Sequence, residues 1–203
     1  MDLNEIYKFI KLIKLDLSNK NTLFSSISKS ILEFSEKKES IIYFIAGKDS
    51  KNINSTNDIE KNINLNGLSY IKIINNLDRK FFQKKNTFSF ISTVSVLKLR
   101  KINNIYCISK KLFENYLVTL IQDELIRSNL NINIFRLGFI KETNKESFLK
   151  LFLGSNYKLI SKFIFKNSIK NKVGLKIYYF PINWNFLSFI IPLVPVKLLN
   201  KFQ

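Results

Sequence analysis

Tyr106 and Lys110 form a Tyr-x-x-x-Lys pair near the start of a long helical run of sequence. Residues four positions apart lie on one face of a helix, so this phenol and this ammonium can point to one place. A nearby lysine cation stabilises a phenolate and lowers the tyrosine pKa, which makes tyrosine a usable proton donor near neutral pH. In a lysine-rich chain this spacing often arises by chance. The surrounding elements must therefore show whether the pair is functional.

The composition excludes several other chemistries. The chain has no histidine and a single cysteine, Cys107, which excludes histidine-based acid–base chemistry, histidine metal sites and an internal disulfide. No metal site is therefore expected. Ser92 and Ser95 have no histidine to activate them as nucleophiles. The 203 residues, 46% of them apolar, are enough for one well-buried core.

The 33 basic and 15 acidic residues give a net charge of +18. Such a charge is compatible with nucleic acid or anionic lipid as a partner. However, only four of the basic residues are arginine, the side chain that best reads phosphates and guanine edges. Lysine, asparagine and isoleucine share AT-rich codons and are all abundant, so we interpret the charge mainly as codon bias and do not expect nucleic-acid binding.

Short apolar runs alternate with longer helical runs along the chain. Strands are predicted over residues 9–15, 41–45, 87–93, 131–136 and 175–180. Helices are predicted over residues 23–34, 58–82, 104–127 and 145–170. Strands separated by long helices indicate crossover connections and a parallel sheet. The expected fold class is therefore α/β, a doubly wound, Rossmann-like parallel sheet.

Polar and small residues stand where several of these strands end, which is where active groups gather in open α/β sheets. Thr93 closes the strand 87–93, thirteen residues before Tyr106. An Asn-x-x-Gly motif, Asn64 to Gly67, lies within a predicted helix. Other strand ends carry Asp16-Leu17, Ala46-Gly47 and Leu137-Gly138.

With these motifs in this order, residues 9–180 resemble the short-chain dehydrogenase/reductase family. The resemblance implies one Rossmann-like domain over residues 1–180, followed by an apolar tail over 181–203. It implies that Tyr106 passes a proton to the substrate oxygen while a nicotinamide delivers hydride. Lys110 would hold the ribose hydroxyls and tune Tyr106, Thr93 would bond the substrate carbonyl, and Asn64 would place a water in the proton relay.

The resemblance also implies a cofactor, NAD or NADP, and the side chains that hold it. The adenine half is expected on Asp16 and Leu17, and the nicotinamide half on residues after the later strands. The full set of expected cofactor-binding residues is Asp16, Leu17, Ala46, Gly47, Tyr106, Lys110, Gly138 and Ile140. The implied reaction is hydride transfer between a carbonyl and an alcohol of a small molecule.

The chain departs from the family pattern at several positions. Phe44 and Ile45 stand where the family has two asparagines, Leu137 stands for proline, and Glu142 stands where a threonine contacts the cofactor. All five glycines are isolated, so the chain has no Gly-x-x-x-Gly-x-Gly turn. We therefore expect a truncated domain that lacks the first two strands and the phosphate-binding turn. A catalytically inactive remnant or partner subunit stays open as the alternative.

The last apolar run, Phe186–Leu199, is shorter than the about 20 residues needed to cross a bilayer. Trp184 before it and Lys197 and Lys201 behind it are residue types that favour membrane interfaces. Contact of residues 184–201 with a membrane surface and folding of the tail onto the core both stay open. The tail also resembles that of reductases linked to cell-surface polysaccharides and lipid-linked sugars, which implies a sugar or lipid-linked sugar substrate.

The expected partners and location follow from the same features. The family assembles through the helices predicted here over 58–82 and 104–127, so the resemblance implies a homo-oligomer. Asp2 and Glu5 stand where a signal peptide carries positive charge. The expected location is cytoplasmic, with peripheral attachment to the inner membrane face if the tail binds lipid.

Overall fold

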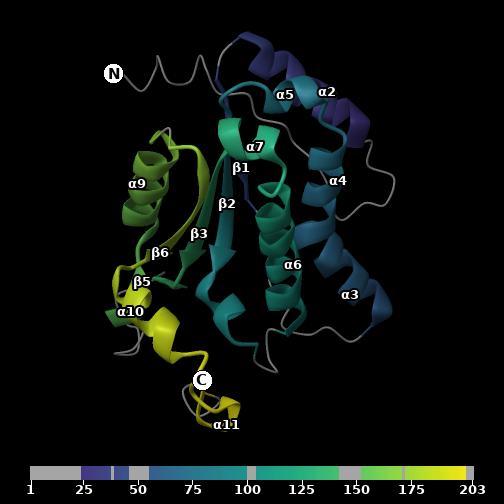
Figure 1. Cartoon of the computed structure of the whole chain (residues 1–203). Helices are drawn as coiled ribbons and strands as arrows, with labels where there is room; N and C mark the ends of the chain where they lie inside the picture. Colours follow the sequence, from purple (N-terminus) through teal and green to yellow (C-terminus); the bar gives the residue numbers. More distant parts are fainter. Residues whose placement is uncertain are drawn as a thin grey trace.

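A four-stranded parallel sheet forms the centre of the protein (Figure 1). The computed structural model describes residues 24–37, 39–45, 55–99, 104–141, 152–170 and 172–199. The strands lie in the order β1-β2-β3-β6, and each pair of neighbours is parallel. Their bounds are β1 Ile41–Phe44, β2 Thr87–Thr93, β3 Asn131–Leu137 and β6 Gly174–Phe180. Four predicted strands are thus confirmed, and the fifth, over 9–15, lies outside the described residues.

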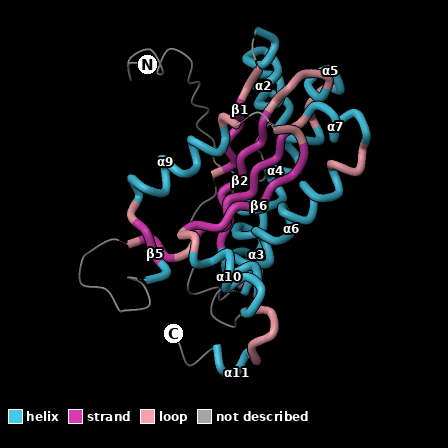
Figure 2. Tube along the Cα trace, turned by 60° about the vertical axis from the view of Figure 1, so that its left-hand side comes forward, coloured by secondary structure: helices cyan, strands magenta, loops and turns pink. Residues whose placement is uncertain are grey.

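Helices cover both faces of this sheet, with α9 on one side and α4 and α6 on the other (Figures 1 and 2). Before β2 the chain forms α2 Phe24–Lys37, α3 Thr56–Ile63, a π-helical turn η1 Asn64–Leu68, α4 Ser69–Asn75 and α5 Arg79–Phe82. Between β2 and β3 it forms a 3-10 turn η2 Val94–Leu97, α6 Asn104–Leu120 and α7 Glu124–Asn129. After β3 come β4 Phe139–Ile140, β5 Gly154–Ser155, α9 Tyr157–Ser168, α10 Asn183–Ile190 and α11 Val196–Leu199.

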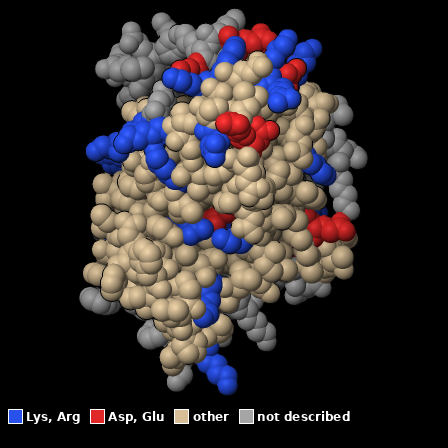
Figure 3. All heavy atoms as spheres, in the orientation of Figure 1, with Lys and Arg blue, Asp and Glu red and all other residues tan. Residues whose placement is uncertain are grey.

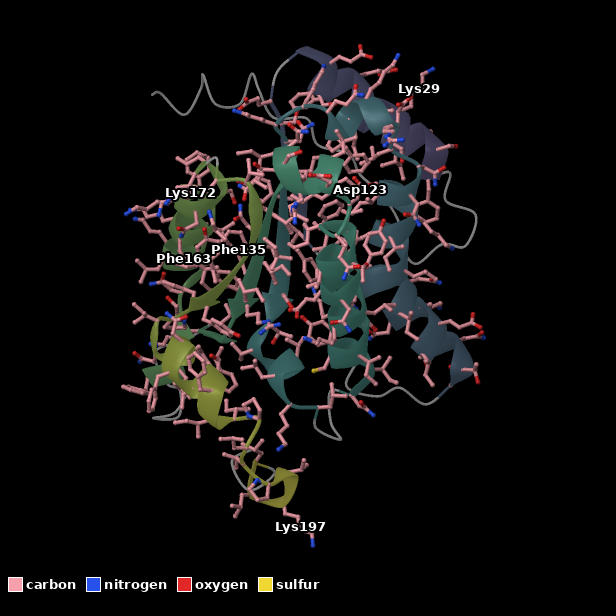
Figure 4. The ribbon with its side chains drawn as sticks, viewed as in Figure 1. Lys29, Asp123, Phe135, Phe163, Lys172 and Lys197 are labelled. Atoms are coloured by element: carbon pink, nitrogen blue, oxygen red, sulfur yellow. The ribbon has the colours of Figure 1, made fainter. Side chains whose placement is uncertain are left out.

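The two faces of the sheet have separate apolar cores because side chains alternate along each strand. Towards α4 and α6 lie fully buried residues that include Phe88, Phe90 and Phe113. Towards α9, Phe135 packs edge-on against Phe163 with ring centroids 6.1 Å apart (Figure 4). Because helices cover both faces, all seven residues of β3 are buried, although three of them are polar.

Two of the predicted helices are interrupted. The prediction of one helix over 58–82 is wrong, because the chain passes through η1 and then turns before α5, which Asp78 caps by accepting from Lys80 N at 2.9 Å. The prediction of one helix over 104–127 is also wrong. It breaks before α7, where Asp123 accepts from Leu125 N at 2.9 Å. Aspartate is a preferred N-cap, so each break lies at a helix start signal.

Of the predicted helix over 145–170, residues 157–168 are confirmed as α9, and residues 145–151 lie outside the described part of the chain. The short strand β5 occupies residues 154–155, and Asn156 then caps α9 by accepting from Leu159 N at 2.9 Å. β5 pairs with β4 just beyond the carboxyl end of β3. None of the helices in the described ranges is long and apolar enough to cross a membrane.

Candidate active site

Of the predicted catalytic residues, Tyr106 and Lys110 lie on α6, and Thr93 ends β2 at the carboxyl end of the sheet. β2 ends at Thr93 and passes into η2, and α6 begins at this end and runs back along the sheet (Figure 1). The register pairs Thr93 with Leu137, and Leu137 with Phe180, so β2, β3 and β6 end level with one another. Residues from the first turns of α6 therefore lie beside the last residues of β2.

Lys110 is fixed between β2 and Tyr106. Its side chain is 1% exposed, and Nζ donates a hydrogen bond to the Ile91 carbonyl at 2.7 Å. Nζ also lies 4.9 Å from the centroid of the Phe90 ring and 5.7 Å from that of Tyr106. Both rings offer their π faces to the ammonium. The predicted Tyr106–Lys110 pair is thus brought together beside the strand that ends in Thr93.

Tyr70 is a second tyrosine at this site, and the sequence analysis missed it. It lies on α4, is 3% exposed, and its hydroxyl has no hydrogen-bond partner among the described residues. Burial raises the pKa of Tyr70 above its usual range, and the neighbouring Tyr106 raises it further. No sequence signal marks Tyr70, because only the packing of α4 against α6 brings it near Tyr106.

Thr93 and Asn64 approach α6 from different elements. Thr93 caps η2: its Oγ1 accepts from Ser95 N at 3.2 Å and donates to Ser95 Oγ at 3.3 Å. Asn64 begins the π-helical turn η1, where its carbonyl accepts from Ser69 N. Gly67 lets η1 pack closely on α6, since a Cβ there would lie 2.6 Å from the Ser109 carbonyl oxygen.

Solved structures share this architecture. A short-chain dehydrogenase from Streptomyces avermitilis superposes with a TM-score of 0.70 at 13% identity, covering 98% of this chain and 82% of the other. L-Sorbose reductase from Gluconobacter frateurii, solved with NADPH and L-sorbose, gives 0.61 at 15% identity over 82% and 73% of the two chains. A SCOR enzyme from Clostridium thermocellum gives 0.65 at 12% identity over 82% and 71%. The chain has the short-chain dehydrogenase fold.

The likeness is one of structure. No protein-family model matches the sequence, and no curated protein matches it by sequence. The fold class expected from the strand and helix pattern is confirmed, as a parallel sheet flanked by helices. At 12–15% identity the comparison establishes the fold, and the residue roles must rest on the geometry of this chain.

Only two of the remaining predicted cofactor residues lie in the described part of this short-chain dehydrogenase fold, Gly138 and Ile140. Gly138 follows β3, and its N–H donates to the Phe180 carbonyl at 2.8 Å. A Cβ on Gly138 would lie 2.1 Å from Trp184 Nε1, so close packing against the tail requires glycine there. Ile140 lies in β4 and is 39% exposed. Asp16, Leu17, Ala46 and Gly47 lie outside the described residues, as does Glu142.

The sequence analysis also missed a buried charged network at the carboxyl end of the sheet. Glu114, 1% exposed, accepts from Arg136 through both carboxylate oxygens, at 3.1 Å from Nε and 2.7 Å from Nη2. Ser92 Oγ donates to the same carboxylate at 2.6 Å. Arg136 Nη1 donates to the Tyr179 hydroxyl at 2.6 Å. The network ties the carboxyl ends of β2, β3 and β6 to α6.

A sequence signal for Glu114 did exist. Tyr106, Lys110 and Glu114 follow one another at four-residue steps, which keeps all three on one face of α6. The partner Arg136 carries no comparable signal, because only the parallel pairing of β3 places it beside that face. Ser92, which has no histidine to activate it as a nucleophile, is a hydrogen-bond donor within the network.

Burial determines the electrostatics of Lys110. Removal from water lowers the pKa of Lys110 from its usual 10.5 to about 7, and the negative charge of Glu114 partly opposes that shift. A lysine in this state exchanges its proton near neutral pH. Its ammonium form, when present, is the cation that stabilises a phenolate at Tyr106.

The lowered pKa predicts how stability depends on pH. Between about pH 7 and pH 10.5 the unfolded chain holds a proton on Lys110 that the folded chain has lost. The free energy of unfolding contributed by this group should therefore rise with pH across that window. Urea unfolding of the wild type and of Lys110→Met at several pH values tests this. We expect the variant to lose the rise, and parallel curves for the two proteins would contradict the assignment.

Proposed function

We propose that this chain is an NAD(P)-dependent oxidoreductase that interconverts a carbonyl and an alcohol on a small molecule, with Tyr106 as the acid/base group. The observation that carries the proposal is Lys110, buried and held by the Ile91 carbonyl beside the Tyr106 ring at the carboxyl end of a parallel sheet. Burying a lysine is costly, and groups with strongly shifted pKa values concentrate at functional sites.

In this proposal Tyr106 and Thr93 both contact the substrate oxygen, Tyr106 by proton transfer and Thr93 by a hydrogen bond. Tyr106 donates or accepts the proton, and the ammonium of Lys110 lowers the energy of its phenolate form. The Thr93 hydroxyl now donates to Ser95 Oγ at the long distance of 3.3 Å. A rotation about its side chain would redirect that proton to a substrate carbonyl. Asn64 completes the proposed proton relay from η1.

The residues described here fit the nicotinamide half of such a cofactor. Within the described part of the chain Lys110 donates to one acceptor, the Ile91 carbonyl, and an ammonium has three donors, so it could also bond the ribose hydroxyls. Gly138 and Ile140 lie at the same end of the sheet. A bound NAD or NADP would supply the hydride. Asp16, Leu17, Ala46 and Gly47 remain the proposed contacts to the rest of the molecule.

The proposals for assembly and substrate rest on one observation each, the exposed apolar residues of α6 and the sequence of the tail. α6 exposes Ile108, Leu112 and Val118, each 40–42% accessible, which supports a homo-oligomer that uses α6 together with the helices of residues 58–82. The substrate class proposed from the tail resemblance is a sugar or lipid-linked sugar. In this proposal the protein acts in the cytoplasm.

A melting-temperature measurement tests the proposal directly. NADH or NADPH should raise the melting temperature of the wild type, because a ligand at 100 times its dissociation constant stabilises by about 2.7 kcal/mol. Lys110→Met should reduce the shift, since it removes the proposed ribose donor. Lys111→Met is the matched control: Lys111 is the next residue on α6, its side chain is 42% exposed, and its shift should equal that of the wild type.

A second candidate function rests on the sequence. No Gly-x-x-x-Gly-x-Gly turn occurs in it, and such turns bind the pyrophosphate of dinucleotides in this class of fold. A non-catalytic partner subunit would show no melting-temperature shift with either cofactor at millimolar concentration. That result would replace the enzyme proposal with this one.

A further inference from the structure

Helix α10 has two apolar faces, and only one of them is covered. Trp184, Leu187 and Ile191 pack against Val94 and Leu97, which belong to η2. Trp184 is 6% exposed, and its Nε1 donates to the Leu153 carbonyl at 2.8 Å. This face anchors the tail to the domain, at the segment that directly follows Thr93.

The opposite face lies open to solvent. Its side chains are Ile182, Phe186, Phe189 and Leu193, with exposed fractions of 73%, 70%, 77% and 82%. These are the four most exposed large apolar side chains in the described part of the chain. Their spacing of four, three and four residues places them along one stripe of the helix and its following turn. We name this stripe the tail face.

Two lysines lie beyond the end of the tail face, and residues 182–193 carry no acidic side chain. Lys98 Nζ donates to the carbonyls of Pro192 at 2.9 Å and Val194 at 2.5 Å, beside the end of the stripe. Lys197 projects from α11 at the tip of the molecule (Figure 4). Residues 147–203 contain nine lysines and no aspartate or glutamate. Figure 3 shows no acidic atoms over α10 and α11 on the visible side, with basic atoms at the lower tip of the molecule near α11.

We propose that the tail face inserts into the surface of a membrane that contains anionic lipids. A helix with an apolar face flanked by lysines lies in the headgroup region, where the apolar side chains enter the acyl boundary and the cations meet lipid phosphates. A second copy of this chain is a poorer occupant, because the two tails would bring like charges together on a protein of net charge +18.

Membrane contact through this face would orient the candidate active site. α10 packs on η2, and η2 follows Thr93, so the tail face and the predicted catalytic residues lie at the same end of the sheet. The site would therefore open near the lipid surface. The inference rests on exposure and charge alone, and it stands whether or not the chain is an oxidoreductase.

Vesicle binding provides the test. The full chain is sedimented with vesicles of phosphatidylcholine, with and without phosphatidylglycerol, at low and high salt. The wild type should bind the anionic vesicles and release them as salt increases, because salt screens surface charge. The double variant Phe186→Ser/Phe189→Ser should bind at least about tenfold more weakly, since it removes two aromatic side chains from the apolar stripe.

A matched control separates this face from general hydrophobicity. Leu159→Ser/Phe165→Ser removes two side chains of α9 that are 52% and 50% exposed, and it should bind as the wild type does. Equal melting temperatures show that all variants are folded. The proposal is overturned if the wild type ignores anionic vesicles, if it binds neutral vesicles equally well, or if the Phe186/Phe189 variant binds unchanged. A change only in the mass of the particle in solution would instead assign the face to contact between copies.

Discussion

Replacing Tyr106 with phenylalanine is expected to lower the rate of carbonyl reduction by about 10²- to 10⁴-fold, the usual contribution of a positioned general acid. The substitution removes one oxygen atom and keeps the ring. The ring contributes the π face near Lys110 Nζ, so the lysine should keep its place against the Ile91 carbonyl. The loss should therefore appear in kcat, with little change in cofactor binding or melting temperature.

The measurement follows NADH and NADPH absorbance with a panel of small carbonyl compounds, for the wild type and for two variants. Tyr116→Phe is the matched control because it lies on the same helix and its hydroxyl donates to Asn75 Oδ1 at 2.6 Å, away from Lys110. We expect Tyr116→Phe to keep full activity. Turnover by Tyr106→Phe at the wild-type rate would refute the role of Tyr106.

The elements that carry this site could be predicted from the sequence because they are local. β2 spans the predicted residues 87–93, because the aromatic and β-branched residues of this segment favour a strand. α6 begins at Asn104, as predicted, and this places Tyr106 and Lys110 in its first turns. From sequence alone, a strand end and a helix start could thus be assigned to Thr93 and to the Tyr106–Lys110 pair.

The features that the sequence analysis missed are of two kinds. Some are helix breaks hidden by a continuous apolar periodicity, and others depend on contacts between elements far apart in the sequence. The caps at Asp123 and Asn156 were readable, but the apolar periodicity on either side of them suggested uninterrupted helices. The π-helical turn at Asn64 depends on packing of Gly67 against α6, which no local pattern reports. Tyr70 likewise enters the site only through the packing of two helices.

The largest stability effect is expected at Glu114. Its carboxylate is the acceptor for both Arg136 and Ser92, all three residues are buried, and Arg136 has no other carboxylate partner among the described residues. Glu114→Leu would leave a buried guanidinium unpaired, which typically costs about 3–5 kcal/mol. Urea unfolding at neutral pH measures the loss of unfolding free energy.

Two further variants make the test specific. Arg136→Met/Glu114→Leu removes both charges, and it should recover most of the loss, because paired buried charges are often replaceable by apolar side chains of similar volume. Lys111→Met removes the outer, 42% exposed partner of Glu114 at 3.5 Å, and it should change stability by less than about 1 kcal/mol. If Glu114→Leu cost no more than Lys111→Met, the buried pair would not be a major contributor to the fold.

Glu114 also links the stability of the sheet end to the proposed chemistry. Its negative charge raises the pKa of Lys110 against the effect of burial, so its removal should lower that pKa below about 7. The rise of stability with pH would then begin at a lower pH in Glu114→Leu than in the wild type. At neutral pH less of the Lys110 side chain would be cationic, and Tyr106 would lose the charge that stabilises its phenolate. The cationic form of Lys110 is lost as pH rises through its pKa. Glu114→Leu should therefore move the alkaline limb of the pH profile for carbonyl reduction to lower pH, whereas a purely structural role for Glu114 would leave that limb in place.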